Sequence, residues 1–232
     1  MEQSEFDKFA DEYYSLHVDN IVMSGESPEY FAEYKIRDLV DIYNASQGCV
    51  EAPCVLDFGA GVGTSVPFMC RYMPRARLTC VDVSSKSLEI GRARFGGVAE
   101  FVLLDGARVP FPDESFDMVF AACVFHHIDQ REHVTLLREM LRVLVSGGVI
   151  LVYEHNPYNP ITRHAVNTCP FDENAHLIPA RSMRRSLVAA GFANPRMRYR
   201  VFFPSLVRGL RRLEPWITWL PLGAQYYVAA SK

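Results

Sequence analysis

The chain has 232 residues, of which 49% are hydrophobic and 22% are charged, so it is long enough to bury a full core as one domain. A formal net charge of -3 and a pI of about 6.2 disfavour a polyanionic partner such as nucleic acid. The acidic N-terminus is unlike a signal peptide, and the sequence has no stretch of about 18 apolar residues that would span a membrane. The six cysteines form no Cys-x-x-Cys pair, which favours a reducing compartment, and we expect a cytoplasmic protein.

Two helices are predicted before the first strand. Residues 6–18 carry aromatic side chains at helical spacing, as in a helix that packs through one face. In residues 28–43, Ser27 stands in the N-cap position, Pro28 lies in the first turn and apolar residues recur on one side. We expect this second helix to cover a sheet.

A glycine loop follows the first predicted strand, residues 54–58. Gly59, Gly61 and Gly63 stand at alternate positions before a helix over 64–73. Glycine permits backbone angles that other residues avoid and lets a ligand lie against the backbone. A nicotinamide cofactor prefers the spacing Gly-x-Gly-x-x-Gly, and Asp57 would repel its pyrophosphate but suits an ammonium or sulfonium group.

The next two predicted strands also end in acids. Residues 78–82 end at Asp82, and residues 100–105 end at Asp105. A carboxylate at the end of the second strand is the usual partner of a ribose diol, because two hydroxyls can donate to its oxygens. After a loop that reads Pro-Phe-Pro-Asp-Glu-Ser-Phe-Asp, a fourth strand runs to Ala122 and a fifth covers 149–153. Strands and helices that alternate in this way predict a doubly wound, mostly parallel sheet.

The glycine loop, the three acids and the loop before the fourth strand resemble the class I S-adenosylmethionine-dependent methyltransferases, in their small-molecule (type 11-like) branch. The resemblance implies a Rossmann-like seven-stranded sheet of order 3-2-1-4-5-7-6, with an antiparallel last strand and helices on both faces. It implies S-adenosylmethionine as cofactor, with Asp57 at its amino acid end, Asp82 at the ribose and Asp105 at the adenine. The cofactor-binding residues expected in full are Tyr13, Asp57, Gly59, Ala60, Gly61, Gly63, Asp82, Val83, Asp105, Gly106, Ala107 and Ala122.

Two adjacent histidines follow the fourth strand. We expect His127 to pack under the next helix with backbone partners, and His126 to face the transferred methyl group. Adjacent side chains diverge, and no cysteine or carboxylate completes a familiar set, so His126, His127 and His133 are not expected to bind a metal.

Residues 154–180 form a proline-rich connection where this family carries substrate-binding insertions. Glu154 and His155 are the candidates for contacting the acceptor. The alternative is a surface loop stabilised by its prolines. A general base is required only if the acceptor loses a proton, and His126, Glu154 and His155 are the candidates for that role.

The C-terminal part predicts a helix over 181–192, a sixth strand at about 198–203 and a seventh over 224–230. Between these strands, residues 204–222 combine an apolar face with two tryptophans and three arginines. Such a segment packs against the protein's own sheet edge or a twin subunit, or lies in a membrane interface.

We therefore expect a single domain over 1–232. It divides into an N-terminal helical lid (1–45), a cofactor-binding core (46–153), a substrate loop (154–180) and a C-terminal part (181–232). The expected activity is in-line methyl transfer to a small molecule, such as a natural product, a sugar or a lipid-linked intermediate, by a monomer or homodimer. The alternative is a catalytically silent cofactor-binding or scaffold protein on the same fold.

Overall fold

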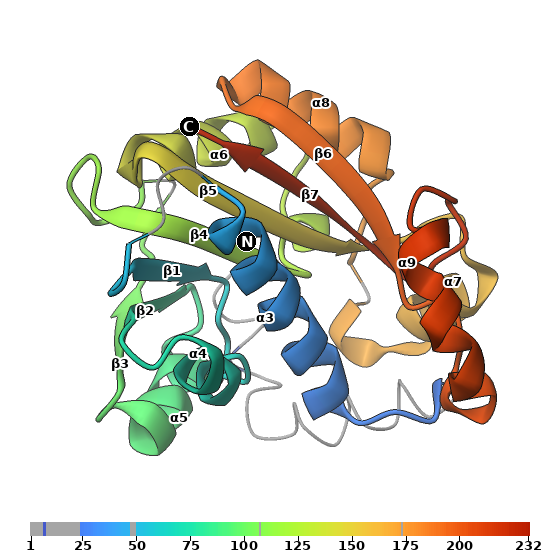
Figure 1. Ribbon diagram of the computed structural model, residues 1–232. Helices are drawn as coiled ribbons and strands as arrows, with labels where there is room; N and C mark the ends of the chain where they lie inside the picture. The colour runs from blue at the N-terminus through green and yellow to red at the C-terminus, as the bar shows by residue number, and fades with distance from the viewer. Residues whose placement is uncertain (1–6, 8–23, 47–49, 107, 173) are drawn as a thin grey trace.

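The computed structural model describes residue 7 and residues 24–46, 50–106, 108–172 and 174–232 (Figure 1). The helix predicted over 6–18 therefore lies outside the described residues apart from Asp7. The carboxylate of Asp7 accepts a hydrogen bond of 2.6 Å from the Ser84 hydroxyl.

The described residues form a seven-stranded sheet of order β3-β2-β1-β4-β5-β7-β6. Strands β1 to β5 pair in parallel, and β7 runs antiparallel to both β5 and β6. The predicted strand order and the antiparallel last strand are confirmed. The bounds are Cys54–Phe58 (β1), Arg77–Asp82 (β2), Ala99–Leu103 (β3), Phe116–Ala122 (β4), Leu144–His155 (β5), Ala193–Arg200 (β6) and Gln225–Ser231 (β7).

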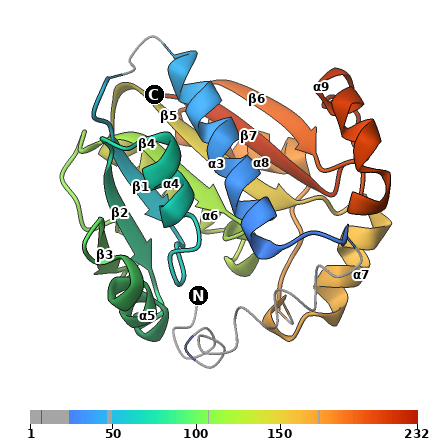
Figure 2. The same cartoon turned by 60° about the horizontal axis from the view of Figure 1, so that its bottom comes forward.

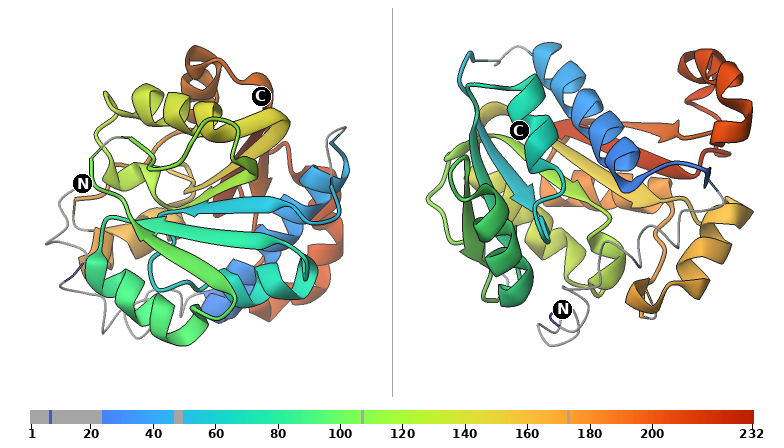
Figure 3. Two further views of the ribbon diagram at one scale, coloured as in Figure 1. Left: turned by 90° about the vertical axis from the view of Figure 1, so that its left-hand side faces the viewer. Right: turned by 90° about the horizontal axis from the view of Figure 1, so that it is seen from below.

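Helices cover both faces of this sheet. Figures 1 and 3 show α3 and α4 on one side and α6 and α8 on the other. The principal helices are α3 (Pro28–Asn44), α4 (Val66–Tyr72), α5 (Ser85–Phe95), α6 (His133–Val143) and α8 (Ala180–Ala190). In β4, Met118 and Phe120 pack with α3 and α4, whereas Val119 and Ala121 pack with α6 and α8. This alternation explains the continuous apolar pattern of the strand, because both of its faces are buried.

The N-cap predicted for α3 is present, since the Ser27 hydroxyl accepts from the Tyr30 amide. The fifth strand begins earlier than predicted. The sequence predicted this strand over 149–153, but β5 starts at Leu144, directly after α6. The register against β4 shifts between Phe116 and Met118, so residues 145–148 form an irregular stretch that contains Gly147 at φ 80°.

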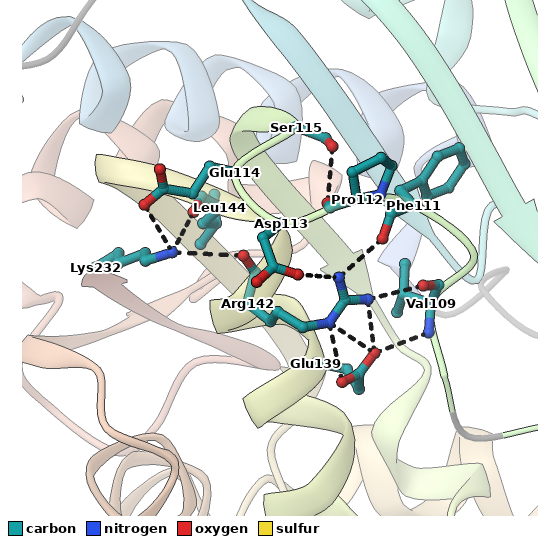
Figure 4. A network of polar contacts seen from close by, with 10 residues as sticks. All are labelled: Val109, Phe111, Pro112, Asp113, Glu114, Ser115, Glu139, Arg142, Leu144 and Lys232. Carbon is teal, nitrogen blue, oxygen red and sulfur yellow. Dashed lines mark hydrogen bonds and ion pairs between the residues drawn. The ribbon is translucent and has the colours of Figure 1, made fainter.

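The loop before β4 is fixed from behind by one arginine of α6 (Figure 4). The Arg142 guanidinium donates to the carbonyl oxygens of Val109 (2.9 Å) and Phe111 (2.8 Å), and it pairs with Asp113 and Glu139. Since this loop leads into the amino end of β4, the Pro-Phe-Pro-Asp-Glu-Ser-Phe-Asp motif has a structural role at the edge of the sheet opposite the glycine loop.

Two connections differ from the sequence expectation. Residues 154–180 contain a helix, α7 (Pro160–Thr168), and a 3-10 turn, η3 (Pro170–Asp172), because Asn159 caps α7 through the Thr162 amide. Residues 204–222 do not form one amphipathic helix but break into η4 (Ser205–Leu213) and α9 (Glu214–Ile217). Among the residues that the structure describes, no helix combines the length and apolar character needed to cross a membrane.

Candidate active site

A cavity lies at the carboxyl ends of β1, β2, β4 and β5, where ligands of open parallel sheets bind. Figure 2 shows α5 and α7 on opposite sides of this end of the sheet. The glycine loop and Asp82 line one part of the cavity. Three histidines, Asp172 and Gln225 line another part, together with apolar side chains of α3 and α7.

The glycine loop needs a glycine at its first position. Gly59 has φ 73°, and a Cβ placed there would stand 2.3 Å from a methyl carbon of Val124. Its amide donates to the Val81 carbonyl at 2.8 Å, which ties the loop to β2. Gly59, Ala60 and Gly61 line the cavity, as predicted for a loop that passes beneath a ligand.

Asp57 points a buried carboxylate into the cavity. Its exposed fraction is 3%, and among the described residues its Oδ2 has no hydrogen-bond partner. Burial, with a smaller effect of the neighbouring Asp82, raises the pKa of Asp57 to about 7, although Lys35 acts to lower it. A cationic group that entered the cavity would find a carboxylate oxygen ready to accept from it.

Asp82 is held by the backbone on both of its oxygens. Oδ2 accepts from the Gly61 amide at 2.8 Å, and Oδ1 accepts from the Ser84 amide at 2.9 Å. Burial raises the pKa of Asp82, and these amide bonds act to lower it. A carboxylate oxygen can accept more than one hydrogen bond. A diol in the cavity can therefore still donate to Asp82.

A cysteine at the end of β4 stands among donors. Cys123 has φ 59°, which is strained for a side chain of this kind, and its Sγ accepts from Lys35 Nζ at 3.5 Å. Burial raises the pKa of the thiol, but His155 and Lys35 together lower it to about 7. Gln225 Nε2 lies 3.4 Å from His155 Nδ1 and 3.7 Å from the sulfur, which makes this a connected polar group.

Glu154 differs from its predicted role. It is fully buried and does not line the cavity, because its carboxylate accepts from the Val124 and Phe125 amides and lies 2.6 Å from His126 Nδ1. Glu154 therefore positions the segment after β4 and cannot touch an acceptor. His126 and His155 do line the cavity, in agreement with their predicted position.

The two adjacent histidines do not diverge as the sequence suggested. They lie in the 3-10 turn η2 (Phe125–His127), and their ring centroids are 4.2 Å apart. Both approach Asp172 Oδ1, at 3.5 Å from His126 Nε2 and 3.4 Å from His127 Nε2. His133, rather than His127, is the histidine that packs inside, where its Nε2 donates to the Phe125 and Ile128 carbonyls.

The remaining predicted cofactor residues fall into three groups. Val83 and Ala122 line the cavity, whereas Gly63, Asp105 and Gly106 do not; Leu104 lines it in place of Asp105. Gly63 packs against Phe101, whose ring would stand 3.2 Å from an added Cβ. Tyr13 and Ala107 lie outside the described residues.

Sequence reasoning missed Lys35, Cys123, Asp172 and Gln225, which all line the cavity. For Lys35 a signal existed, because it falls at helical spacing with Phe31, Ala32 and Leu39 on the buried side of α3. No local signal marked Asp172, since only the packing of η3 against η2 brings it to the histidines.

Comparison with known proteins shows what the core of the chain resembles. Residues 55–148 match the family model described as "Methyltransferase domain". This stretch of the chain is similar to a methyltransferase domain. One protein similar in sequence is the ubiquinone/menaquinone biosynthesis C-methyltransferase of Hahella chejuensis, which is 34% identical over 124 residues, 50% of this chain and 49% of that protein. The chain thus spans about half the length of the curated relatives it matches.

Solved structures share the fold of this chain. A SAM-dependent methyltransferase from Archaeoglobus fulgidus superposes with a TM-score of 0.68 at 16% identity, covering 89% of this chain and 95% of that one. Phosphoethanolamine N-methyltransferase 2 of Haemonchus contortus, in complex with S-adenosyl-L-methionine, gives 0.66 at 15% identity, covering 98% and 60%.

S-adenosylmethionine is bound in the Haemonchus contortus structure, and two features of the cavity in this chain would fit the same molecule. The Asp57 oxygen that has no hydrogen-bond partner among the described residues suits the ammonium group of the cofactor. Nothing lies within 4 Å of a Cβ added at Gly61, so a ligand has room to lie against the backbone there.

Proposed function

We propose that this protein transfers the methyl group of S-adenosylmethionine to a small acceptor. The supporting observation is that one cavity contains both the glycine loop with its acids and a second part rich in histidine. The cofactor supplies an activated methyl group, so the chain has to align the two reactants and exclude water.

The cofactor side of the proposal keeps most of the expected residues. Asp57 accepts from the ammonium group, and Gly59, Ala60 and Gly61 pass beneath the amino acid part. Asp82, with Val83, receives the ribose hydroxyls. Leu104, rather than Asp105, packs against the adenine, because Leu104 faces the cavity and Asp105 is exposed. Ala122 stands beside the methyl donor.

The acceptor side favours a largely apolar molecule with one polar end. Phe31, Ile161 and Val166 supply an apolar wall, while His155 and Gln225 supply hydrogen-bonding groups. An aromatic or lipid-like acceptor fits this wall better than a sugar does. His155 is the residue that we assign to acceptor contact, and residues 154–180 form the acceptor side through α7.

A lipid-linked acceptor is favoured by a specific observation. Tyr158 and Ile161 at the start of α7 are exposed, as are Leu206, Trp216 and Trp219 of the C-terminal segment. Aromatic and aliphatic side chains of this kind enter a membrane interface. In this form of the proposal, the segment 204–222 contacts the membrane that holds the substrate.

Calorimetric titration tests the cofactor assignment. We expect S-adenosylmethionine and S-adenosylhomocysteine to bind with micromolar affinity, and NADH not to bind. Asp57→Ala and Asp82→Ala should each weaken binding at least tenfold, whereas Asp105→Ala should bind as the wild type does. Binding of NADH alone, or equal binding by all variants, would overturn the assignment.

Transfer of a labelled methyl group tests the acceptor class. Phenols, quinols and sugars are compared as acceptors in the presence and absence of lipid vesicles, with His155→Ala as the site variant and the exposed His164→Ala as its control. We expect label in the aromatic acceptors, and a lower kcat only for His155→Ala. Label that appears only in sugars would contradict the apolar-acceptor proposal.

A further inference from the structure

Three side chains in the acceptor part of the cavity bring their possible ligand atoms close together. His126 Nε2 and His127 Nε2 stand 3.5 and 3.4 Å from Asp172 Oδ1, and the ligand atoms of the three residues lie within 4.8 Å of one another. These separations are longer than good hydrogen bonds of about 2.7–3.2 Å. They match the edge of a tetrahedron, about 3.4 Å, around a metal ion whose bonds to nitrogen and oxygen are about 2.1 Å long.

A carboxylate behind the first histidine sets its orientation. Glu154 Oε2 lies 2.6 Å from His126 Nδ1, and Glu154 Oε1 is held by the Val124 and Phe125 amides. Metal-binding histidines commonly give their other ring N–H to a carboxylate, which leaves the far nitrogen free to bind the ion. Here that far nitrogen, His126 Nε2, faces Asp172.

The charge of the cluster also favours a cation. Glu154 and Asp172 are both buried carboxylates that flank His126, so a cation at this position, either a protonated imidazole or a metal ion, lies between two negative charges. Among the described residues, Lys35, Cys123 and His155 are further charged or titratable groups that line the cavity, and Cys123 interacts with both of the others. All three ligand residues line the cavity, so a bound ion would keep positions open toward it.

We propose that His126, His127 and Asp172 bind a divalent transition-metal ion whose open positions take an oxygen of the acceptor. Two imidazoles with one carboxylate suit Zn²⁺, Fe²⁺ or Co²⁺ better than Mg²⁺ or Ca²⁺, which prefer oxygen ligands. Three protein ligands with an open position are the pattern of catalytic rather than structural sites. The metal site itself does not depend on the proposed function. The contact between the metal ion and the methyl acceptor does depend on the proposed function.

The test is a titration of the full chain, after treatment with a chelator, with Co²⁺, followed by visible absorption. We expect one equivalent to bind with the intense bands of a four- or five-coordinate ion. His127→Ala and Asp172→Ala should weaken binding at least tenfold, and His164→Ala, an exposed histidine of α7, should not change it.

Glu154→Gln is the more specific test, because it keeps the size of the side chain. The side-chain oxygen of glutamine can also still accept the two hydrogen bonds from the backbone amides. Its amide would donate to His126 Nδ1, which forces the ring proton onto Nε2, where the metal should bind. We expect Co²⁺ affinity to fall by about 10–100-fold, the range found for such supporting carboxylates. The circular dichroism spectrum should stay that of the wild type.

Failure of this proposal is separable from failure of the proposed function. No Co²⁺ binding, or equal binding by wild type and all variants, would overturn the metal site. It would instead support a charged His126 between Glu154 and Asp172, which needs no metal. Binding of S-adenosylhomocysteine is measured on protein from which a chelator has removed any metal. This binding tests the methyltransferase proposal alone.

Discussion

Asp57 is a buried carboxyl group that costs the folded state free energy at neutral pH. Its pKa rises from an ordinary 3.8 to about 7 in the folded chain. The unfolded chain therefore loses this proton near pH 4 and the folded chain near pH 7. Between these values the folded state binds the extra proton, so the contribution of Asp57 to stability falls as the pH rises across that window.

We predict that Asp57→Asn stabilises the cofactor-free protein at pH 8, because asparagine remains neutral at every pH. One pKa unit corresponds to about 1.4 kcal/mol, so the gain is at most roughly 4 kcal/mol. It should shrink toward zero near pH 4. Urea unfolding at both pH values measures the gain, with the exposed Asp105→Asn as the matched control. A variant less stable than the wild type at pH 8 would contradict the prediction.

The site residues near strand ends could be predicted from the sequence, because each follows an apolar run that ends on the same side of the sheet. Asp57, Asp82 and the glycines were identified in this way. Glu154 was not distinguishable from His155, since adjacent residues of a strand point to opposite faces and the sequence does not say which face is open. Asp172 depends on the packing of a turn 45 residues after His127, which no spacing rule reveals.

At the scale of elements, Arg142 joins α6 to the loop before β4 (Figure 4). Its guanidinium makes hydrogen bonds to two carbonyl oxygens and two carboxylates. Lys232, the last residue, extends the network by donating to the Leu144 carbonyl at 2.6 Å. The loop that carries the family resemblance is thus held by contacts remote from the cavity.

We predict that Arg142→Met lowers the free energy of unfolding by roughly 2–4 kcal/mol, because it leaves several acceptors without their charged donor. Arg138→Met, one turn earlier on the exposed side of α6, should change it by less than about 0.5 kcal/mol. Urea unfolding measures both. The affinity for S-adenosylhomocysteine should stay unchanged in the folded Arg142 variant, and a loss of affinity would mean that the loop supports the cavity after all.

Helices whose apolar residues recur with a regular period could be predicted from the sequence. Segments in which glycine or proline opposes the apolar pattern could not. α3 has an apolar face at helical spacing and forms where expected. The fifth strand was expected from residue 149, but β5 begins at Leu144 and includes Gly147 and Gly148 in an irregular stretch. In residues 204–222, Pro204, Pro215 and Pro221 oppose a continuous helix, and the observed segment is accordingly broken into short turns.

At the scale of the whole molecule, the two ends of the sheet have different tasks. The carboxyl ends of the strands carry the cavity, and the amino ends carry the Arg142 network. Residues 204–222, between β6 and β7, belong to neither the cavity nor the Arg142 network. Leu206 is 93% exposed and does not pack on the protein's own sheet edge, and contact of the segment with a twin subunit or a membrane stays a prediction.

The two tryptophans of the sequence both lie in this segment, with exposed fractions of 73% for Trp216 and 69% for Trp219. We predict that dilute protein emits like tryptophan in water, and that urea unfolding barely shifts the emission maximum while circular dichroism shows a cooperative transition. Addition of vesicles should shift the emission to the blue if the segment enters a membrane interface, because the indoles then leave water.

The same measurement distinguishes the other form of burial. A blue shift that grows with protein concentration, without vesicles, would indicate a twin subunit over Trp216 and Trp219. Trp216→Gln and Trp219→Gln identify which indole reports the change. Blue emission in dilute protein that moves to the red on unfolding would contradict the exposed position of this segment.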